Sequence, residues 1–310
     1  MALRHILLAA VLWYGPTATP LWSWDLDVHR LVNGHAVDLT PGPLGDFLRL
    51  HRERIVALSI DADHRREHDP SEAPNHYIEF EYYGGLPYFS VPYDRGEAEA
   101  RFGAENMAKW GVLPWHTLDV TQALRDALAN GEWDKVVVLA ADLGHYVADG
   151  HQPFHTTANY DGQLSGNTGI HRMFELFMVN RYLDHYHRPT PPLPLVEDLP
   201  ASLFMWLVEN LQEVEGILAA DTWAREDLTS QAKAIISQGY DGKPDVIPSS
   251  YLERLYVQTG LTAWTCMTKA TVRLAALWLW AWEEAGRPTP PQSVWPWAYP
   301  PREVPESPDR

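Results

Sequence analysis

Apolar residues recur at three- and four-residue intervals along most of this chain, which is the spacing of one face of an α-helix. Amphipathic helices are therefore expected over residues 44–60, 97–110, 115–129, 203–220, 224–238 and 251–285. No stretch alternates convincingly between apolar and polar residues, as a half-buried strand would. The pattern predicts an all-α fold.

Residues 133–150 form a helical segment of a different kind, because apolar residues lie on several of its faces, including Val136, Val137 and Leu143. A helix that is apolar all round is buried inside the protein. Gly150 and the proline three residues later are expected to end it. The polar residues near its C-terminal end therefore start from a dry environment.

The segments between these helices have the composition of loops and connectors. Residues 61–76 are rich in Asp, His, Arg and Pro, and residues 159–169 are polar and rich in glycine. We expect one mostly helical domain over 24–287 and a Pro-rich C-terminal tail over 288–310. The alternative is two domains separated at the Pro-rich connector Pro189–Pro200.

The first 23 residues have the composition of an export signal. Arg4 and His5 form a short basic start, and Ile6–Tyr14 is an apolar run too short to span a bilayer. Residues 15–23 are polar and end in a small residue. We expect a cleaved signal peptide over 1–23 and a secreted or periplasmic protein; an uncleaved membrane anchor is the alternative.

Composition adds two constraints. The formal net charge of −17 argues mildly against binding polyanions by general surface attraction, although bound divalent cations would reverse the charge of a cleft locally. The chain has a single cysteine, Cys266, which excludes an internal disulfide. Additional stability must therefore come from packing or from metal ions.

Five side chains of metal-ligating types lie between residues 145 and 175. They are His145, Asp149, His155, His171 and Glu175. Two pairs are four residues apart on predicted helices (133–150 and 170–187), so the members of each pair share one helix face. Imidazole nitrogens and carboxylate oxygens are common ligands of zinc and similar ions.

Ion pairs with basic residues are the competing explanation for these polar side chains. Arg172 and Arg181 are the only Lys or Arg residues between positions 136 and 187. Because an unpaired ionised group is costly to bury, a metal ion is the more economical partner.

The sequence Leu-Gly-His145-Tyr-Val-Ala-Asp149-Gly-His-Gln-Pro-Phe-His155 resembles the signature of the zinc-dependent phospholipase C and S1/P1 nuclease superfamily. Gly-Ile-His171-Arg-Met-Phe-Glu175 resembles the second half of that signature. The spacing differs from the Glu-x-x-His of di-iron bundles and from the His-Glu-x-x-His of metalloproteases.

Shorter upstream segments are similar to the same superfamily. Trp24-x4-His29 resembles its N-terminal Trp and His, and Asp61-Ala-Asp63 with His76-Tyr-Ile resembles its Asp and His pair. Gly-Val-Leu-Pro-Trp115 is similar to bacterial phospholipase C-like members. The matches extend from about residue 24 to residue 175.

The resemblance implies a mostly helical fold of the phospholipase C/P1 nuclease type with three zinc ions in a cleft. Carried over to this chain, the first Zn²⁺ takes Asp61, His76, His145 and Asp149, and the second takes His155, His171 and Glu175. The third takes Asp149, His29 and the amino and carbonyl groups of Trp24. This last expectation requires signal cleavage directly before Trp24.

The choice between Asp61 and Asp63 remains open. Spacing to His76 favours Asp61 over Asp63 as the ligand, and Asp61 is then the expected catalytic residue that orients or deprotonates the attacking water. Tyr77, directly after His76, is the aromatic residue expected to line the cleft and bind substrate.

The resemblance implies hydrolysis of phosphodiesters by a metal-activated water. A phospholipase C is favoured, since the last ligand is Glu175, the loop between His155 and His171 is short, and the protein is acidic. The expected partner is a phospholipid, with transient contact to a membrane surface. Alternatives are an S1/P1-type single-strand nuclease, which would bind nucleic acid, and a non-catalytic binding protein with structural zinc. No obligate protein partner is indicated.

Overall fold

The computed structural model describes residue 24 and residues 26–84, 90–186, 192–238 and 246–293. The described residues are mostly helical and contain no strand, which confirms the all-α prediction. The signal peptide expected over residues 1–23 and most of the predicted tail lie outside the described residues.

Eight α-helices lie in the described residues up to Asp149. They are α1 (Leu26–Leu39), α2 (Gly42–Leu50), α3 (Arg52–Leu58), α4 (Asp61–Arg66), α5 (Arg95–Phe102), α6 (Ala104–Trp110), α7 (Leu113–Ala129) and α8 (Trp133–Asp149). Three 3₁₀ turns lie among and after them: η1 (Ala73–His76), η2 (Phe80–Tyr83) and η4 (Pro153–Thr156).

The second half begins with a composite helix and ends with a long one. The composite helix consists of α9 (Ile170–Arg172), the π-helix η5 (Met173–Met178), α10 (Val179–Tyr182) and the 3₁₀ turn η6 (Leu183–His185). It is followed by α11 (Leu199–Leu211), α12 (Val214–Arg225), α13 (Ser230–Ser237) and α14 (Ser249–Glu284).

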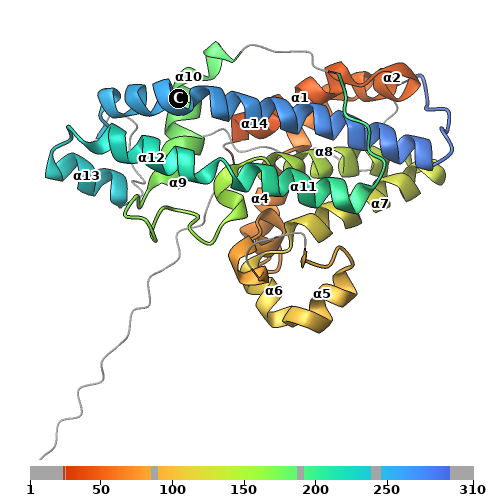
Figure 1. The fold of residues 1–310 in the computed structure, drawn as a ribbon. Coiled ribbons are helices and arrows are strands. Elements are labelled where there is room, and N and C mark those ends of the chain that lie inside the picture. Colours follow the sequence, from red (N-terminus) through yellow and green to blue (C-terminus); the bar gives the residue numbers. More distant parts are fainter. Residues whose placement is uncertain (1–23, 25, 85–89, 187–191, 239–245, 294–310) are drawn as a thin grey trace, which may run out of the picture.

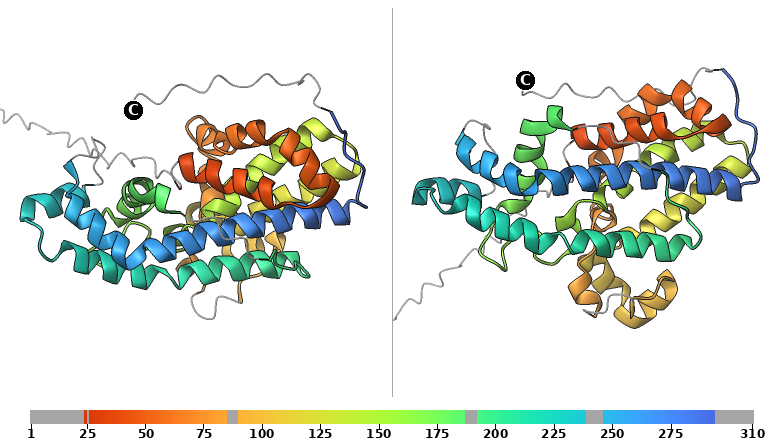
Figure 2. Two further views of the ribbon diagram at one scale, coloured as in Figure 1. Left: turned by 90° about the horizontal axis from the view of Figure 1, so that it is seen from above. Right: turned by 45° about the horizontal axis from the view of Figure 1, so that its top comes forward.

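Helix α14 runs along almost the whole body, with α11 and α12 beside it (Figures 1 and 2). It packs against α12 and also against α1, α7 and α8. Helices α5 and α6 project from one side of this body (Figure 1). Helices from both sides of the predicted connector Pro189–Pro200 therefore share one hydrophobic core.

Helix α8 is buried as its composition predicts, and it passes unusually close to α1. An added Cβ at Gly144 on α8 would lie 2.0 Å from Oδ1 of Asn33 on α1. Asn33 is itself fully buried and donates through Nδ2 to the His29 carbonyl at 3.0 Å. Only glycine permits this approach, which brings His29 of α1 beside the polar end of α8.

The loop predicted for residues 61–76 was wrong in its first part, because Asp61–Arg66 form α4. The charges that suggested a loop instead complement the helix dipole. Asp61 and Asp63 occupy the first turn, and His64, Arg65 and Arg66 occupy the last. Ala62 and Asp63 are buried, so packing stabilises this short helix as well.

Other differences concern helix continuity rather than helix type. Residues predicted as one helix over 44–60 are divided at His51 into α2 and α3. Gly103, with φ 84°, separates α5 from α6 within the predicted helix 97–110. No helix of the described residues is both long enough and apolar enough to cross a membrane.

Candidate metal centre

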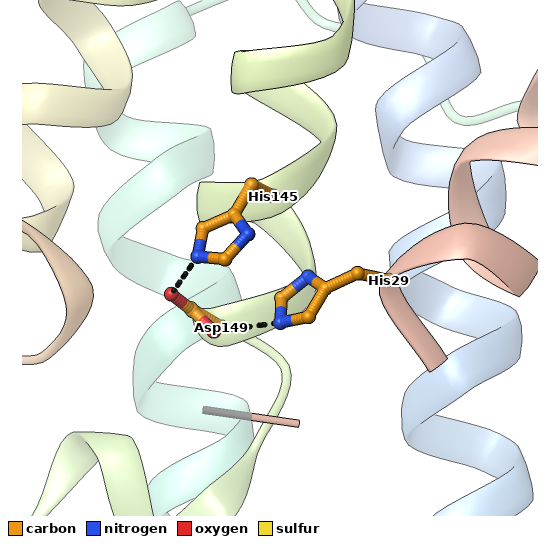
Figure 3. Close-up of side chains that lie close together, drawn as sticks. All are labelled: His29, His145 and Asp149. Atoms are coloured by element: carbon orange, nitrogen blue, oxygen red, sulfur yellow. Dashed lines mark ion pairs between the residues drawn. The ribbon is translucent and has the colours of Figure 1, made fainter. Parts of the chain in front are cut away.

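Four of the predicted ligands meet at the buried end of α8. His145 and Asp149 project from α8, His29 comes from α1, and His76 is the last residue of η1. All four are at most 1 % exposed. Figure 3 shows the first three side chains, with the Asp149 carboxylate between the imidazoles of His29 and His145.

The Asp149 carboxylate is the centre of this arrangement. Its Oδ1 lies 3.5 Å from Nε2 of His29, and its Oδ2 lies 3.2 Å from Nε2 of His145 and 2.9 Å from Nδ1 of His76. The rings of His29 and His145 stack with their centroids 3.9 Å apart. The resemblance implies a carboxylate shared between two ions, and the position of Asp149 between two groups of histidines is compatible with that role.

Asp63, rather than Asp61, lies beside these histidines. Oδ1 of Asp63 is 3.8 Å from Nδ1 of His76 and 3.9 Å from Nε2 of His145, and Asp63 is buried. Asp61 is about one-quarter exposed and faces His64, with 3.8 Å between Oδ1 and Nδ1. The difference arises because residues two apart on α4 point in different directions, and sequence spacing to a distant histidine does not register this.

The remaining predicted ligands form a second buried group. His155 comes from η4, His171 from α9 and Glu175 from η5. Nε2 of His171 lies 2.9 Å from Oε2 of Glu175, and Nε2 of His155 lies 3.9 Å from the same oxygen. His155 Nδ1 is also 3.7 Å from Asp149 Oδ1, so the second group adjoins the first.

Three sets of ligand atoms in the described residues are close enough to surround an ion. They are His29, His145 and Asp149; Asp63, His76 and His145; and His155, His171 and Glu175. The carboxylate oxygens Asp63 Oδ1 and Asp149 Oδ1 are buried and accept no hydrogen bond. Because leaving such oxygens unsatisfied is costly, these donor sets suit metal cations, and their mixture of imidazole and carboxylate suits a zinc-like ion.

The electrostatics of the first group depend on the same carboxylates. Burial alone would lower the pKa of His145, but Asp149 and Asp63 raise it to about 9. Burial alone would raise the pKa of Asp149, yet the neighbouring histidines hold it well below its usual range. Asp149 therefore stays ionised in this dry site, and a cation bound there would displace the proton from His145.

Two ligand histidines are oriented by main-chain carbonyls. Nδ1 of His145 donates to the Ser59 carbonyl at 2.8 Å, and Nδ1 of His155 donates to the His76 carbonyl at 2.9 Å. A neutral imidazole that donates through Nδ1 keeps a lone pair on Nε2. Nε2 of His145 faces Asp149 and Nε2 of His155 faces Glu175, so the main-chain carbonyls favour the tautomer that could bind a metal ion at these atoms.

Gln152 orients the second group and was not anticipated from the sequence. Its Nε2 donates to Oε2 of Glu175 at 2.8 Å, and its Oε1 accepts from the Phe154 backbone N–H at 2.6 Å. Gln152 is fully buried. The signal that could have revealed it is a lone amide side chain between two ligands in a stretch that is otherwise apolar or metal-binding.

The π-helix η5 begins two residues after His171 and contains Glu175. A π-helix is wider than an α-helix and is frequently found at functional sites. The Asp161 carboxylate accepts hydrogen bonds from the backbone N–H groups of Gly169, at 3.0 Å, and His171, at 3.3 Å. These bonds hold the start of α9 to the polar loop 159–169.

Trp24 packs against the helix that carries Glu175, and Tyr77 directly follows His76. The Trp24 ring is buried, with its centroid 6.0 Å from that of Phe174 on η5, and the residues before it lie outside the described ranges. Its proposed free amine therefore stays a prediction. Tyr77 is partly exposed, donates to the Lys109 carbonyl at 3.1 Å, and has a pKa that burial raises to about 12.

Comparison with known proteins does not assign the chain. No protein-family model matches it, and a search of curated proteins finds no significantly similar sequence.

Proposed function

We propose that this protein is a metal-dependent phosphodiester hydrolase of the phospholipase C type, with zinc as the expected ion. The observation that carries the proposal is the convergence of His29, Asp63, His76, His145 and Asp149 with His155, His171 and Glu175 in adjoining buried groups. The resemblance of residues 143–175 to the superfamily signature supports the same proposal.

Three ions would be held by these side chains. The first set is Asp63, His76, His145 and Asp149, the second is His155, His171 and Glu175, and the third is Asp149, His29 and Trp24. Bound zinc supplies an activated water near neutral pH and neutralises charge that develops on phosphoryl oxygens. Asp149 holds His29, His76 and His145 around one carboxylate, so the relative positions of two donor sets depend on it.

We place the role of general base on Asp63 instead of Asp61. Asp63 would ligate the ion through Oδ1, which faces His76 and His145, and its other carboxylate oxygen would orient the water or take its proton. Asp61 stands outside the donor sets and faces His64. Tyr77, at the partly exposed edge of the site, would contact the substrate.

The preferred substrate is a phospholipid. Three sequence features favour it: the last ligand is Glu175, the loop after His155 is short, and the protein is acidic. A single-strand nuclease is the second candidate. It is favoured by two partly exposed aromatic residues, Tyr77 and Tyr160. Burial and the negative charge of Glu79 raise the pKa of both. Bases stack on such rings without regard to sequence.

The test supplies zinc-loaded protein with phosphatidylcholine micelles, single-stranded DNA and p-nitrophenyl phosphorylcholine, each with and without a chelator. Chelator-sensitive release of phosphocholine is expected. Asp149→Asn should abolish it, whereas Asp46→Asn, which removes a surface carboxylate paired with Arg49, should not. Cleavage of DNA alone would show that the protein is a nuclease. Bound zinc without turnover of any of these substrates would indicate a purely structural metal centre.

A further inference from the structure

His76 faces the metal centre through a different nitrogen from His145 and His155. Its Nδ1 lies 2.9 Å from Asp149 Oδ2, 3.1 Å from His145 Nε2 and 3.8 Å from Asp63 Oδ1. Ligation of an ion in this set therefore requires a lone pair on Nδ1, and in a neutral imidazole the proton must then reside on Nε2.

The Nε2 atom of His76 is buried and makes no hydrogen bond in the structure. Oε1 of Glu72 lies 3.6 Å from it. That distance is a few tenths of an ångström beyond a hydrogen bond, so a small rotation of the ring brings the two atoms into contact. His145 and His155 rely on main-chain carbonyls for the equivalent contact, whereas His76 has a carboxylate.

Glu72 is held in place from the other side. The hydroxyl of Tyr146, one residue after His145 on α8, donates to Glu72 Oε1. Arg65 Nη2 lies 3.7 Å from the same oxygen and donates to the Tyr146 hydroxyl at 3.0 Å. Arg65 Nη1 also donates to Asp142 Oδ1 at 3.1 Å, so α4, α8 and η1 are connected through this network.

We propose that Glu72 is a positioning residue that accepts the Nε2–H of His76 and thereby presents the Nδ1 lone pair of His76 to the metal ion bound with Asp63 and His145. Arg65 and Tyr146 hold the Glu72 carboxylate at the required place. This inference rests on the proposed metal centre. A carboxylate behind a ligating imidazole fixes its tautomer and makes it a stronger ligand, and loss of such a partner typically weakens metal binding about 10–100-fold.

The test measures zinc affinity by competition with a chromophoric chelator, and follows the visible absorption spectrum of the Co²⁺-loaded protein. Glu72→Leu should weaken one binding step about 10–100-fold and alter the Co²⁺ spectrum, with the other steps unchanged. Glu72→Gln should restore part of the affinity, because its amide oxygen still accepts the Nε2–H. Because Gln also has the shape of Glu, the Co²⁺ spectrum, which reports on the ligands around the ion, separates a positioning role from a packing role.

A matched control and a second variant keep the result interpretable. Glu99→Leu removes a half-exposed carboxylate paired with Arg95 and should leave every binding step unchanged. If Glu72→Leu does not fold, Tyr146→Phe removes the hydroxyl that anchors Glu72 and should weaken the same step by a smaller factor. Unchanged affinity and spectrum in folded Glu72→Leu, with metal bound normally by the unmodified protein, would overturn this inference alone. An unmodified protein that binds no metal would overturn the proposed function as well.

Discussion

At the scale of single residues, the candidate site depends on which buried carboxylate oxygens accept no hydrogen bond. Asp149 Oδ1 and Asp63 Oδ1 are both buried without a hydrogen bond, and each lies within ion-pair distance of imidazoles. A carboxylate with such an oxygen is stable in a dry site when a cation compensates it. The two residues therefore define where metal is expected more sharply than the count of histidines does.

Comparison of Asp63→Asn with Asp61→Asn tests the ligand assignment. Asp63→Asn should lose one metal ion per chain, because the amide is a poor ligand and its buried NH₂ faces imidazoles. Asp61→Asn should retain all bound metal, since Asp61 is partly exposed and faces His64. Elemental analysis of the two purified proteins gives the answer, and the reverse result would return the ligand role to Asp61.

At the scale of elements, the close approach of α1 to α8 brings His29 within reach of Asp149. Gly144 and Asn33 are in contact where the two helices meet, and the ring of His29 stacks on that of His145 one residue further along α8. The π-helix η5 makes a similar contribution in the second group, because it carries Glu175 next to His171.

Gly144→Ala should separate these helices. The new methyl group would overlap the buried Asn33 side chain, and overpacking of this kind costs about 1–3 kcal/mol in the free energy of unfolding. Metal affinity should fall too, since His29 would move away from Asp149. Urea unfolding and metal titration measure both effects.

Gly216→Ala on α12 is the matched control, because no heavy atom lies within 4 Å of the added Cβ. It should stabilise the protein by roughly 0.5–1 kcal/mol through the higher helix propensity of alanine. A Gly144→Ala protein as stable and as metal-rich as Gly216→Ala would contradict the close-packing argument.

At the scale of the whole molecule, a continuous helical core surrounds a polar centre. Helix α14 contacts α1, α7, α8 and α12, so a helix far downstream of the signature packs against the helices that carry His29, His145 and Asp149. Many of the enclosed histidines are kept neutral by burial, which makes stability depend on pH.

The metal-free protein should lose stability as pH falls from about 6.5 to about 4. Burial lowers the pKa of His116 from 6.5 to about 4, so between these values the unfolded chain binds a proton that the folded protein excludes. Each such histidine reduces the free energy of unfolding by up to about 1.4 kcal/mol per pH unit in this window. His116→Gln should flatten the dependence measured by urea unfolding, and His68→Gln, at an exposed position, should not. Equal slopes for both variants would refute the assignment.

Removal of metal should destabilise the whole molecule, because the donor sets join α1, η1, α8 and η5. A single site at 100 times its dissociation constant contributes about 2.7 kcal/mol, or roughly 5–10 °C in Tm for a protein of this size. Differential scanning calorimetry with and without chelator measures the shift. A Tm that does not respond to chelator and excess zinc would argue against a bound metal.

Much of this protein was predictable from its sequence. Helical periodicity indicated the all-α fold, and the apolar surroundings of 133–150 indicated that α8 is buried. The i, i+4 pairs His145/Asp149 and His171/Glu175 were predictable because residues four apart in a helix share a face whatever the rest of the chain does.

Only the tertiary structure decided which distant residues join those pairs. The choice between Asp61 and Asp63 depends on how α4 packs on α8, and the contact of Glu72 with His76 depends on Arg65 and Tyr146 holding it. Local sequence determines helix faces through backbone geometry, but the rotation and approach of one helix against another depend on side-chain packing across the core. The local sequence thus determines the pairs His145/Asp149 and His171/Glu175. The complete centre exists only when α1, α4 and η1 pack around them.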